Sequence, residues 1–265
     1  MRTRPSPDNP YGYSRWGFAW EHVPRAGRGH LDFGCGDGAF LASLRAKAVG
    51  QLVGVDISRD AVAAARARFP DLDVRHIGRT APLDFPDGAF SSVTLMDVLE
   101  HVHEQADLLA ELRRILAGGG LLIVTVPRRG VFSCLDMGNW KFRFPRLHRW
   151  CYLAARSRED YERRYVAGPD GLVGDVSARK RWHEHFSQAG LAAVLGRAGF
   201  EPVAFDGSSL LARPLAPLAW LMRKVPVLRL AARVFEQLDG RLFRSMNLFC
   251  LARPKPHPKA KGTAK

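Results

Sequence analysis

The chain has 265 residues, 46% of them hydrophobic, which is enough for one substantial core, so we expect a single domain with additions. Its four cysteines (Cys35, Cys134, Cys151 and Cys250) form no C-x-x-C pair or zinc-ligand spacing, and no run of about eighteen uninterrupted apolar residues occurs. Disulfides, a zinc site and a membrane-spanning helix are therefore not expected. The net charge of +14 lies outside residues 31–127 and favours an anionic partner.

Residues 1–30 are expected to form an aromatic cap. Residues 1–10 are polar and proline-rich and lack the apolar segment of a secretory signal, so none is expected there. The scattered cysteines are typical of reduced residues in an intracellular protein. Residues 10–23 are too aromatic for a disordered tail. Their aromatic side chains are expected either to cover a ligand-binding mouth and exclude water or to pack against the edge of a sheet. They are Tyr11, Tyr13, Trp16 and Trp20.

A glycine-rich turn between two apolar segments is the most informative feature. Residues 31–33 form a short apolar strand that breaks at Gly34, and a helix is expected over 39–48. A second apolar strand, about twenty residues later, ends at Asp56, where a β-α-β unit would place a carboxylate against two ribose hydroxyls. The pattern predicts a nucleoside-binding site.

The spacing of the glycines separates two classes of nucleotide. Dinucleotide sites favour G-x-G-x-x-G, in which a helix N-terminus faces a pyrophosphate, whereas the glycines here fall as G-x-G-x-G at positions 34, 36 and 38. Asp32 and Asp37 flank or interrupt them and would repel a pyrophosphate. They suit a cofactor that carries an ammonium group and no phosphate, such as S-adenosylmethionine.

Residues 32–38 (DFGCGDG), followed by Asp56, resemble the first two motifs of class I methyltransferases. The resemblance implies a Rossmann-like, doubly wound α/β fold, in which a seven-stranded sheet has an antiparallel last strand and carries helical insertions. It implies S-adenosyl-L-methionine as the cofactor and a methyltransferase domain made of residues 31–127 and 183–252. The cofactor-binding residues that it implies are Asp32, Gly34, Cys35, Gly36, Asp37, Gly38, Asp56, Ile57, Arg79, Thr80 and Asp97.

Residues 78–91 depart from the family where adenine should bind. A helix is expected over 59–69 and a third strand over 72–76, after which the small-molecule subgroup often shows an acid that binds the adenine amine. Arg79 stands in its place, and an arginine can only donate. Ser91 likewise replaces an aspartate. We therefore expect adenine to be held by backbone groups, by Thr80 or by stacking on Ile57.

Residues 97–102 (DVLEHV) resemble a turn that lines the methyl-transfer site of the same subgroup, which makes His101 a candidate catalytic residue. If the turn is helical, Asp97, Glu100 and His101 share one face. In ubiquinone-pathway O-methyltransferases and small-RNA 2′-O-methyltransferases a Glu-x-x-Glu-His version binds a divalent metal, but Asp97 is one methylene shorter. We expect structural hydrogen bonds and no metal here; a metal on these residues is the alternative.

Strands and helices alternate through the rest of this part. A fourth strand is expected over 92–96, an amphipathic helix over 107–117 that ends at the glycines 118–120, and a buried fifth strand over 121–126. Five strands separated by helices predict a doubly wound parallel sheet. Residues 201–205 and 246–252 are expected to close it with an antiparallel pair.

Residues 128–182 are expected to cover the substrate. The segment 140–152 alternates aromatic and basic residues, which suits an amphipathic anionic ligand or, through stacking and phosphate contacts, single-stranded nucleic acid. The composition does not separate these partners. Nucleic acid is the weaker expectation, because the chain has no recognisable RNA-binding module and no Asn-Pro-Pro-Tyr-type motif.

His183 and His185 are the leading candidates for a general base. They precede a helix expected over 188–198, and a similar histidine-containing run lies at the acceptor pocket in the subgroup. A histidine can accept a proton from a hydroxyl near neutral pH. Two histidines one residue apart point to opposite faces of an extended chain, so at most one is expected to be catalytic. The alternative is that both are structural and that catalysis relies on proximity.

Residues 214–238 combine an apolar face with a basic rim, and residues 207–265 carry 12 Lys/Arg against 2 Asp/Glu. The pattern is typical of an interfacial membrane anchor or of a lid over an apolar pocket, and a helical hairpin packed on the core is the alternative. We expect an amphipathic helical insertion over 208–245 and a basic disordered tail over 253–265.

These features predict an S-adenosylmethionine-dependent methyltransferase that O-methylates a small or lipid-linked acceptor, for which the charge favours an anion. We expect it in the cytoplasm, at the inner face of the membrane if 214–238 is a peripheral anchor. An RNA methyltransferase and a non-enzymatic, membrane-associated scaffold that has kept the fold are the alternatives.

Overall fold

The computed structural model describes residues 6–12, 14–47, 49–129, 144–154, 156–165, 184–208 and 247–256, and the single positions 225, 228, 231, 234 and 238. Tyr13, Cys134, His183, residues 214–224 and the end of the chain from residue 257 lie outside this part. The predictions made for them stay predictions.

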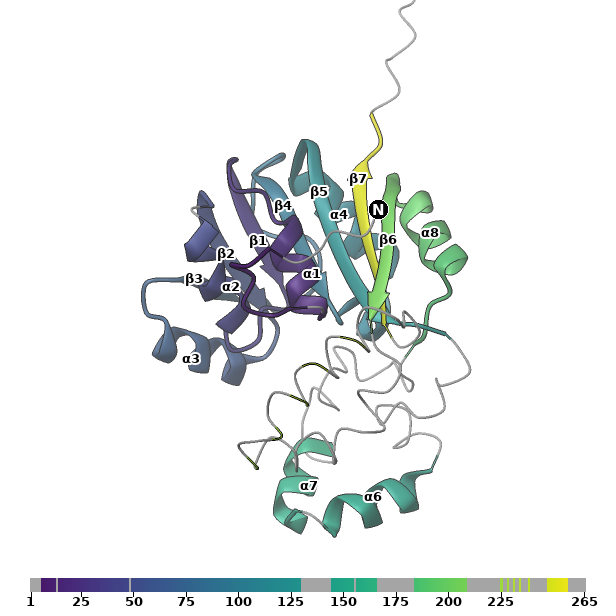
Figure 1. Cartoon of the computed structure of the whole chain (residues 1–265). Coiled ribbons are helices and arrows are strands. Elements are labelled where there is room, and N and C mark those ends of the chain that lie inside the picture. The colour runs from purple at the N-terminus through teal and green to yellow at the C-terminus, as the bar shows by residue number, and fades with distance from the viewer. Residues whose placement is uncertain are drawn as a thin grey trace, which may run out of the picture.

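The described strands form one seven-stranded sheet in the order β3-β2-β1-β4-β5-β7-β6 (Figure 1). β7 runs antiparallel to both of its neighbours, and the other neighbouring strands are parallel. The predicted sheet is therefore confirmed. The strands are β1 (Gly29–Phe33), β2 (Gln51–Asp56), β3 (Asp73–His76), β4 (Phe90–Met96), β5 (Leu116–Pro127), β6 (Phe200–Ser208) and β7 (Asn247–Pro254).

Helices cover both faces of this sheet, as a doubly wound fold requires (Figure 1). Leu31 and Phe33 of β1 pack with α4 (Gln105–Ile115) and α8 (Gln188–Arg197), whereas Ile123 of β5 packs with the helices of the other face. That second group is α1 (Arg15–His22), α2 (Ala39–Ser43) with the 3-10 turn η1 (Leu44–Lys47), and α3 (Arg59–Arg68).

Two further helices, α6 (Pro145–Leu153) and α7 (Arg158–Tyr165), lie beyond the carboxyl ends of the parallel strands (Figure 1). This is the side of the sheet on which open α/β proteins bind their ligands. Among the helices of the described residues, none combines the length and the apolar content needed to cross a bilayer.

α1 packs across the middle of the sheet and not against its edge. Trp20 is buried in the same cluster as Phe40 of α2, and α1 contacts β4, β5 and β7. The Ser14 hydroxyl caps the first turn of α1, and the Lys47 ammonium donates to the carbonyls of Trp20 and Val23 at its other end. The expectation of edge packing for the aromatic segment is thus corrected.

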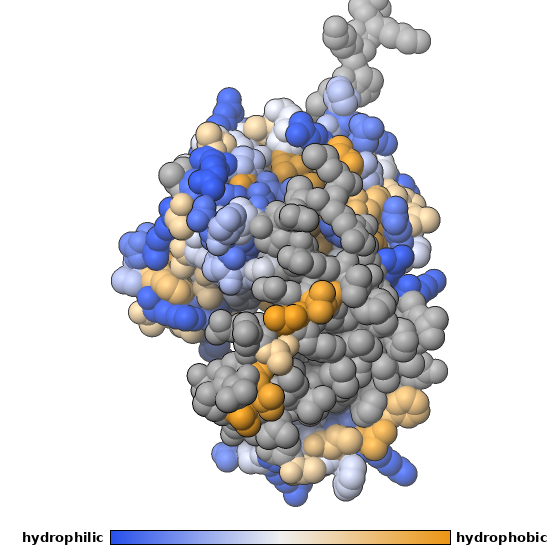
Figure 2. Space-filling model, viewed as in Figure 1, coloured by the Kyte–Doolittle hydropathy of each residue, from blue (hydrophilic) through white to orange (hydrophobic). Residues whose placement is uncertain are grey.

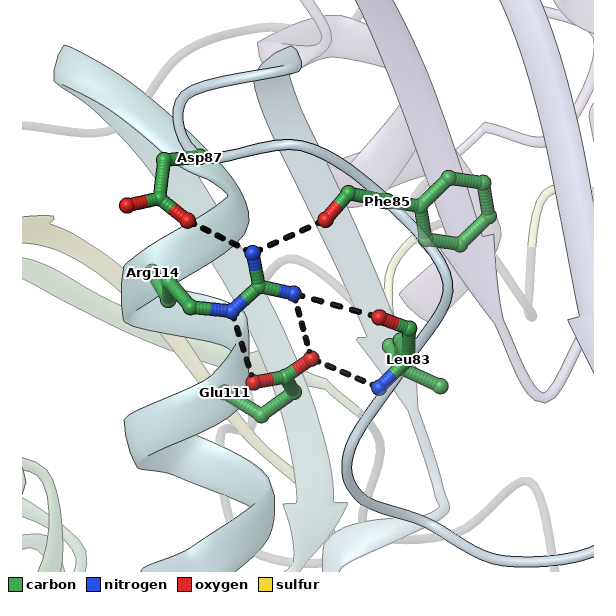
Figure 3. A network of polar contacts seen from close by, with 5 residues as sticks. All are labelled: Leu83, Phe85, Asp87, Glu111 and Arg114. Carbon is green, nitrogen blue, oxygen red and sulfur yellow. Dashed lines mark hydrogen bonds and ion pairs between the residues drawn. The ribbon is translucent and has the colours of Figure 1, made fainter.

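Arg114 ties the connection between β3 and β4 to α4 (Figure 3). Its guanidinium donates to the carboxylates of Glu111 (2.7 Å) and Asp87 (2.6 Å) and to the carbonyls of Phe85 (2.8 Å) and Leu83 (3.2 Å). Glu111 accepts the backbone N–H of Leu83 in turn. The hydrogen bond from Arg114 lowers the pKa of Glu111, which favours the ion pair. The bonds of this pair to Leu83, Phe85 and Asp87 fix the position of the chain that leads into β4.

Three boundaries differ from those predicted. The helix after the glycine-rich turn changes to the 3-10 turn η1, and α4 ends at Ile115, before the three glycines. Leu116 already pairs with Phe90 of β4, so the glycines occupy a register shift in the β4–β5 ladder. β7 continues to Pro254, and the Lys255 N–H donates to the carbonyl of Gly199, so this end of the chain is ordered beyond residue 253.

Candidate active site

Four amides of the glycine-rich turn, those of residues 34, 35, 36 and 38, are bonded within the protein. The N–H groups of Gly34 and Cys35 donate to the carbonyl of Val55 (2.8 and 3.1 Å), and the Gly38 N–H donates to the carbonyl of Cys35 (3.0 Å). The Gly36 N–H donates to the carboxylate at the end of β2 (2.9 Å). A pyrophosphate binds such amides as donors, so this turn is not a phosphate nest.

Asp37 holds the position at the N-terminus of α2 where a phosphate would bind. Its Oδ1 accepts the N–H of Ala39 (3.2 Å), and its Oδ2 pairs with Arg68 of α3 (2.6 Å). A carboxylate at this end of a helix satisfies the helix dipole and repels a second anion. Direct binding of the cofactor by Asp37 stays a prediction.

Asp56 contacts both the glycine-rich turn and the residue that caps α3. Its Oδ2 accepts the N–H of Gly36, and its Oδ1 accepts the N–H of Ser58 (2.8 Å), whose hydroxyl caps α3. Each carboxylate oxygen has a second lone pair. The group can therefore hold the turn and accept hydrogen bonds from a vicinal diol such as ribose at the same time.

Gly36 leaves the main chain open to a ligand. Its φ is +53°, and a Cβ atom built on it meets no atom within 4 Å. At Gly34 the same atom would lie 2.4 Å from the side chain of Val98, so that glycine is required by packing. An open backbone beside Asp56, in a turn where the N–H groups of residues 34, 35, 36 and 38 already have acceptors, fits a nucleoside that carries a cation.

Asp32 supplies a buried carboxylate next to this turn. Its Oδ1 accepts from Thr94 (2.7 Å), whereas its Oδ2 is buried without a hydrogen-bond partner among the described residues. Burial raises the pKa of Asp32 from 3.8 to about 7, and the charge of Asp56 adds to the rise against the lowering effect of the Thr94 bond. An orphaned buried acceptor of this kind fits a cationic group of a cofactor. Cys35, by contrast, is buried, and burial raises the pKa of its thiol.

The turn after β4 is not α-helical, so the condition under which Asp97, Glu100 and His101 would share one helical face is not met. Asp97 has a φ of +52°, and the 3-10 turn η2 (Leu99–His101) begins after it. Glu100 is fully buried, and its carboxylate lies 3.8 Å from Nε2 of His101. Within the part of the chain that the structure describes, no three His, Cys, Asp or Glu side chains gather as metal ligands.

Asp97 connects the end of β4 to the N-terminal helix. Its carboxylate accepts from Thr125 of β5 (2.8 Å) and pairs with Arg15 of α1. Positive φ at a residue other than glycine is a strained conformation that clusters at functional sites. Because Asp97 directly follows β4, its ion pair with Arg15 holds the start of α1 against the carboxyl end of the sheet.

His185 lies beside the carboxyl end of β5. Phe186 forms a parallel bridge with Arg128, and its N–H donates to the carbonyl of Pro127 (2.9 Å). The segment therefore extends the edge at which β1, β2 and β4 also end. His183 lies outside the described residues.

Gln105 links this segment to the turn that carries His101. Its side-chain amide donates to the Glu184 carboxylate (2.9 Å) and to the carbonyl of Leu99 in η2 (3.0 Å). The fold thus brings two of the three predicted catalytic histidines, His101 and His185, to neighbouring turns at one edge of the sheet.

The residues expected around adenine are exposed or only partly buried. Thr80 and Ile57 are half-buried, and Arg79 is exposed. Ser91 lies at the other end of β4, where its hydroxyl accepts the N–H of Arg28 (2.8 Å). Its difference from the family pattern therefore does not concern the cofactor.

Comparison with known proteins agrees with this geometry. Residues 31–124 match the family model described as a methyltransferase domain. The chain is 40% identical over 108 residues to a probable S-adenosylmethionine-dependent methyltransferase of Mycolicibacterium smegmatis, a match that covers 41% of each chain. Residues 31–124 are a class I methyltransferase domain. Its cofactor is S-adenosyl-L-methionine, as predicted.

Two further comparisons define how far the likeness of the methyltransferase domain extends. The ubiquinone biosynthesis O-methyltransferase of Methylococcus capsulatus is 35% identical over 125 residues, or 46% of this chain and 52% of that one. The chain thus spans 41% and 52% of the length of these two curated relatives. An S-adenosylmethionine-dependent methyltransferase from Methanosarcina mazei has the same fold, with a TM-score of 0.53 at 18% identity over 91% of this chain and 98% of that one.

Sequence reasoning missed three residues of the methyltransferase domain and its cap. Arg15 could not be identified from the sequence, because its ion pair with Asp97 joins two segments that are far apart in the chain. Thr94 and His30 lie on strands that read as apolar, yet both occupy the same strand face as Asp32. The alternation of polar residues along β1 and β4 was the signal that could have found them.

Gly36→Ala is expected to separate cofactor binding from folding. Gly119, at the opposite end of the sheet, provides the matched control, because it also has positive φ (+78°) and open space at its Cβ. Each substitution should cost about 1 kcal/mol of stability. If Gly36 borders the cofactor as predicted, only the methyl group at position 36 meets the ligand, so this variant should bind S-adenosylhomocysteine roughly tenfold or more weakly in calorimetry. Equal affinity of the two variants would contradict the assignment.

Proposed function

We propose that this chain transfers a methyl group from S-adenosylmethionine to a hydroxyl oxygen of a small or lipid-linked acceptor. The observation that carries the proposal is the turn at Gly36, whose own N–H donates to Asp56 while space beside its Cα stays open to a ligand. The relative named a ubiquinone biosynthesis O-methyltransferase supports a small-molecule hydroxyl as the acceptor.

The protein's part in this reaction is positioning. When bound, the cofactor would supply a methyl group on a sulfonium, from which a neutral thioether, S-adenosylhomocysteine, is a good leaving group. Asp56 orients the ribose, and Asp32 binds the ammonium group. Arg15 holds α1 over the carboxyl end of β4, which excludes water from the site. Correct in-line placement of the acceptor oxygen then provides most of the acceleration.

His185 or His101 accepts the proton that the hydroxyl loses. Each lies at the edge of the sheet where the parallel strands end, His101 in the turn after β4 and His185 beside the end of β5. A general base of this kind contributes roughly 100- to 10,000-fold to the rate. Geometry does not require both, so one of them carries the proton and the other supports the pocket.

Glutamine substitutions test this role. His185→Gln and His101→Gln should each leave the affinity for S-adenosylhomocysteine unchanged, and one of them should lower kcat by roughly 100-fold or more. His103→Gln, on an exposed residue two positions from His101, is the control. The assay uses radiolabelled methyl donor with a catechol and a phenol, each with and without a prenyl chain. Unchanged kcat in both variants would exclude histidine as the base.

The surface around the proposed acceptor side favours a lipid-linked acceptor presented by an anionic bilayer. Of the exposed large apolar side chains in the described part, all but Val203 come from residues 144–153 and 225–238. Figure 2 shows side chains of both segments on the face in view. The surrounding sequence is basic, with 13 Lys/Arg against 6 Asp/Glu over residues 128–182. Apolar side chains within a basic field are what an anionic membrane surface attracts.

Vesicle sedimentation tests this surface. The wild-type chain should sediment with vesicles that contain about 30% phosphatidylglycerol and much less with pure phosphatidylcholine. A double variant, Leu147→Glu with Trp150→Glu, changes two exposed positions of α6 (43% and 70% exposed) and should lose most of the binding. Val203→Glu, at an exposed apolar position of β6 (51%), is the control. Equal losses in both variants would refute a localised surface.

A further inference from the structure

Four buried polar residues lie side by side on one face of β1 and β4. His30 pairs with Ser92 and Asp32 with Thr94 in the parallel register of the two strands. All four are at most 1% exposed, beneath the face that α1 and α2 cover. Such a group inside a sheet is costly unless its hydrogen bonds are complete.

The hydrogen bonds run in a continuous line. His30 Nδ1 lies 2.8 Å from the Ser92 hydroxyl, and His30 Nε2 lies 3.0 Å from the Thr94 hydroxyl. The Thr94 hydroxyl lies 2.7 Å from Asp32 Oδ1, and its other neighbour, the carbonyl of Leu31, is 3.5 Å away.

The chemistry of the groups fixes the direction of this line when Asp32 is ionised. A carboxylate only accepts, so Thr94 must donate to it and must accept from His30 Nε2–H. Burial, and secondarily the charge of Lys47, lowers the pKa of His30 from 6.5 to about 3, so the ring is neutral and has one N–H. Its Nδ1 therefore accepts from Ser92, and every proton in the line points toward Asp32.

We propose that Ser92, His30 and Thr94 are positioning residues for Asp32: they commit its Oδ1 to the protein and keep its buried Oδ2 as the acceptor for the ammonium group of the cofactor, directly or through one water. The inference rests on the proposed function and adds the residues that prepare the cation-binding carboxylate.

The charged and titratable groups near this line come from four elements. Asp56 at the end of β2 acts on Asp32, and the Cys35 thiol of the turn is itself affected by Asp32. Lys47 of η1 acts on His30, which lies on β1 with Asp32. Asp56 therefore opposes ionisation of Asp32, and the Thr94 bond is the protein contact that favours it.

The first test needs no ligand. Nitrogen-15 spectra of the histidine rings at about pH 8, with the His30 signals identified by their loss in His30→Gln, should show a neutral ring protonated on Nε2. They should stay unchanged in the control Ser91→Ala, whose hydroxyl bonds elsewhere. A ring protonated on Nδ1 would overturn the inferred direction.

The second test compares two ligands across pH. S-adenosylhomocysteine carries the ammonium group, and 5′-methylthioadenosine lacks it. Affinity for the first should rise as pH rises toward 7 and Asp32 ionises, whereas affinity for the second should stay flat. Thr94→Val should move that rise upward by about one pH unit and weaken the first ligand roughly tenfold at neutral pH, with less than about a twofold effect on the second. Thr94→Ser should restore the wild-type profile.

The outcomes separate this inference from the proposed function. If neither ligand binds, the proposed function fails, and the ring spectra alone still decide the direction of the line. If both bind and Thr94→Val leaves the pH profile unchanged, the positioning role is wrong while the cofactor assignment stands. A pH dependence shared by both ligands would also overturn it, because the second ligand has no ammonium group.

Discussion

Asp56→Ala is expected to remove detectable binding of S-adenosylhomocysteine and with it any methyl transfer. The substitution deletes the acceptor for the N–H groups of Gly36 and Ser58, which shape the turn, and with it the acceptor that we propose for the ribose hydroxyls. Hydrogen bonds to a charged group contribute about 1.5–3 kcal/mol each. Loss of the two to ribose alone predicts affinity roughly 100- to 10,000-fold lower.

Calorimetry and circular dichroism measure this effect against a matched control. Asp60 lies in the exposed first turn of α3, four residues beyond Asp56, and Asp60→Ala should bind the ligand within about twofold of wild type. Both variants should keep the wild-type circular dichroism spectrum, because water can replace the lost carboxylate at a half-buried site. Retained binding in folded Asp56→Ala would refute the role of this residue.

Asp32→Asn is expected to make the ligand-free protein more stable at neutral pH while it weakens cofactor binding. Burial raises the pKa of Asp32 to about 7, so its contribution to stability is fully present below pH 3.8 and is lost as pH rises through 7. The depressed pKa of His30, about 3, has the opposite sign: its contribution is present above pH 6.5 and is lost as pH falls toward 3.

Between about pH 4 and 6.5, the contributions of Asp32 and His30 to the free energy of unfolding change with pH in opposite directions. Each changes by up to about 1.4 kcal/mol per pH unit. The pair should therefore give the wild-type protein little pH dependence in that window. In Asp32→Asn the histidine slope remains, so the free energy of unfolding should rise with pH and exceed wild type by up to about 4 kcal/mol near pH 7.

Urea denaturation at a series of pH values measures this difference, with Asp60→Asn as the control that should follow wild type. His30→Gln should show the reverse slope, a stability that falls as pH rises from about 4 to 7. Parallel stability curves for wild type and Asp32→Asn would contradict the buried, ionisable role of Asp32.

Local sequence patterns were sufficient to predict the fold and the cofactor. The apolar strands, the glycines at 34, 36 and 38 and the acid at the end of β2 are features of short segments, and their spacing is what a β-α-β unit constrains. The helix boundary at residue 115 was missed because pairing of Leu116 with Phe90 is a sheet contact. Such contacts override the helix-ending preference of the glycines that follow.

The parts of the site that could not be predicted depend on tertiary register. The φ of Asp97 places its carboxylate toward Thr125 and Arg15, and no spacing rule for a helix anticipates this. The line through His30 exists because β1 and β4 are neighbours in a defined register, although they are separated by two strands in sequence.

The most direct measurement is a calorimetric titration of the wild-type chain with S-adenosylhomocysteine and, separately, with NAD. Saturable one-site binding of the first and no heat with the second are expected, because the Gly36 and Ala39 N–H groups already donate to the carboxylates of Asp56 and Asp37, which would repel a pyrophosphate. Binding of NAD, or a folded protein that takes up neither ligand, would contradict the assignment of this site to a sulfonium nucleoside.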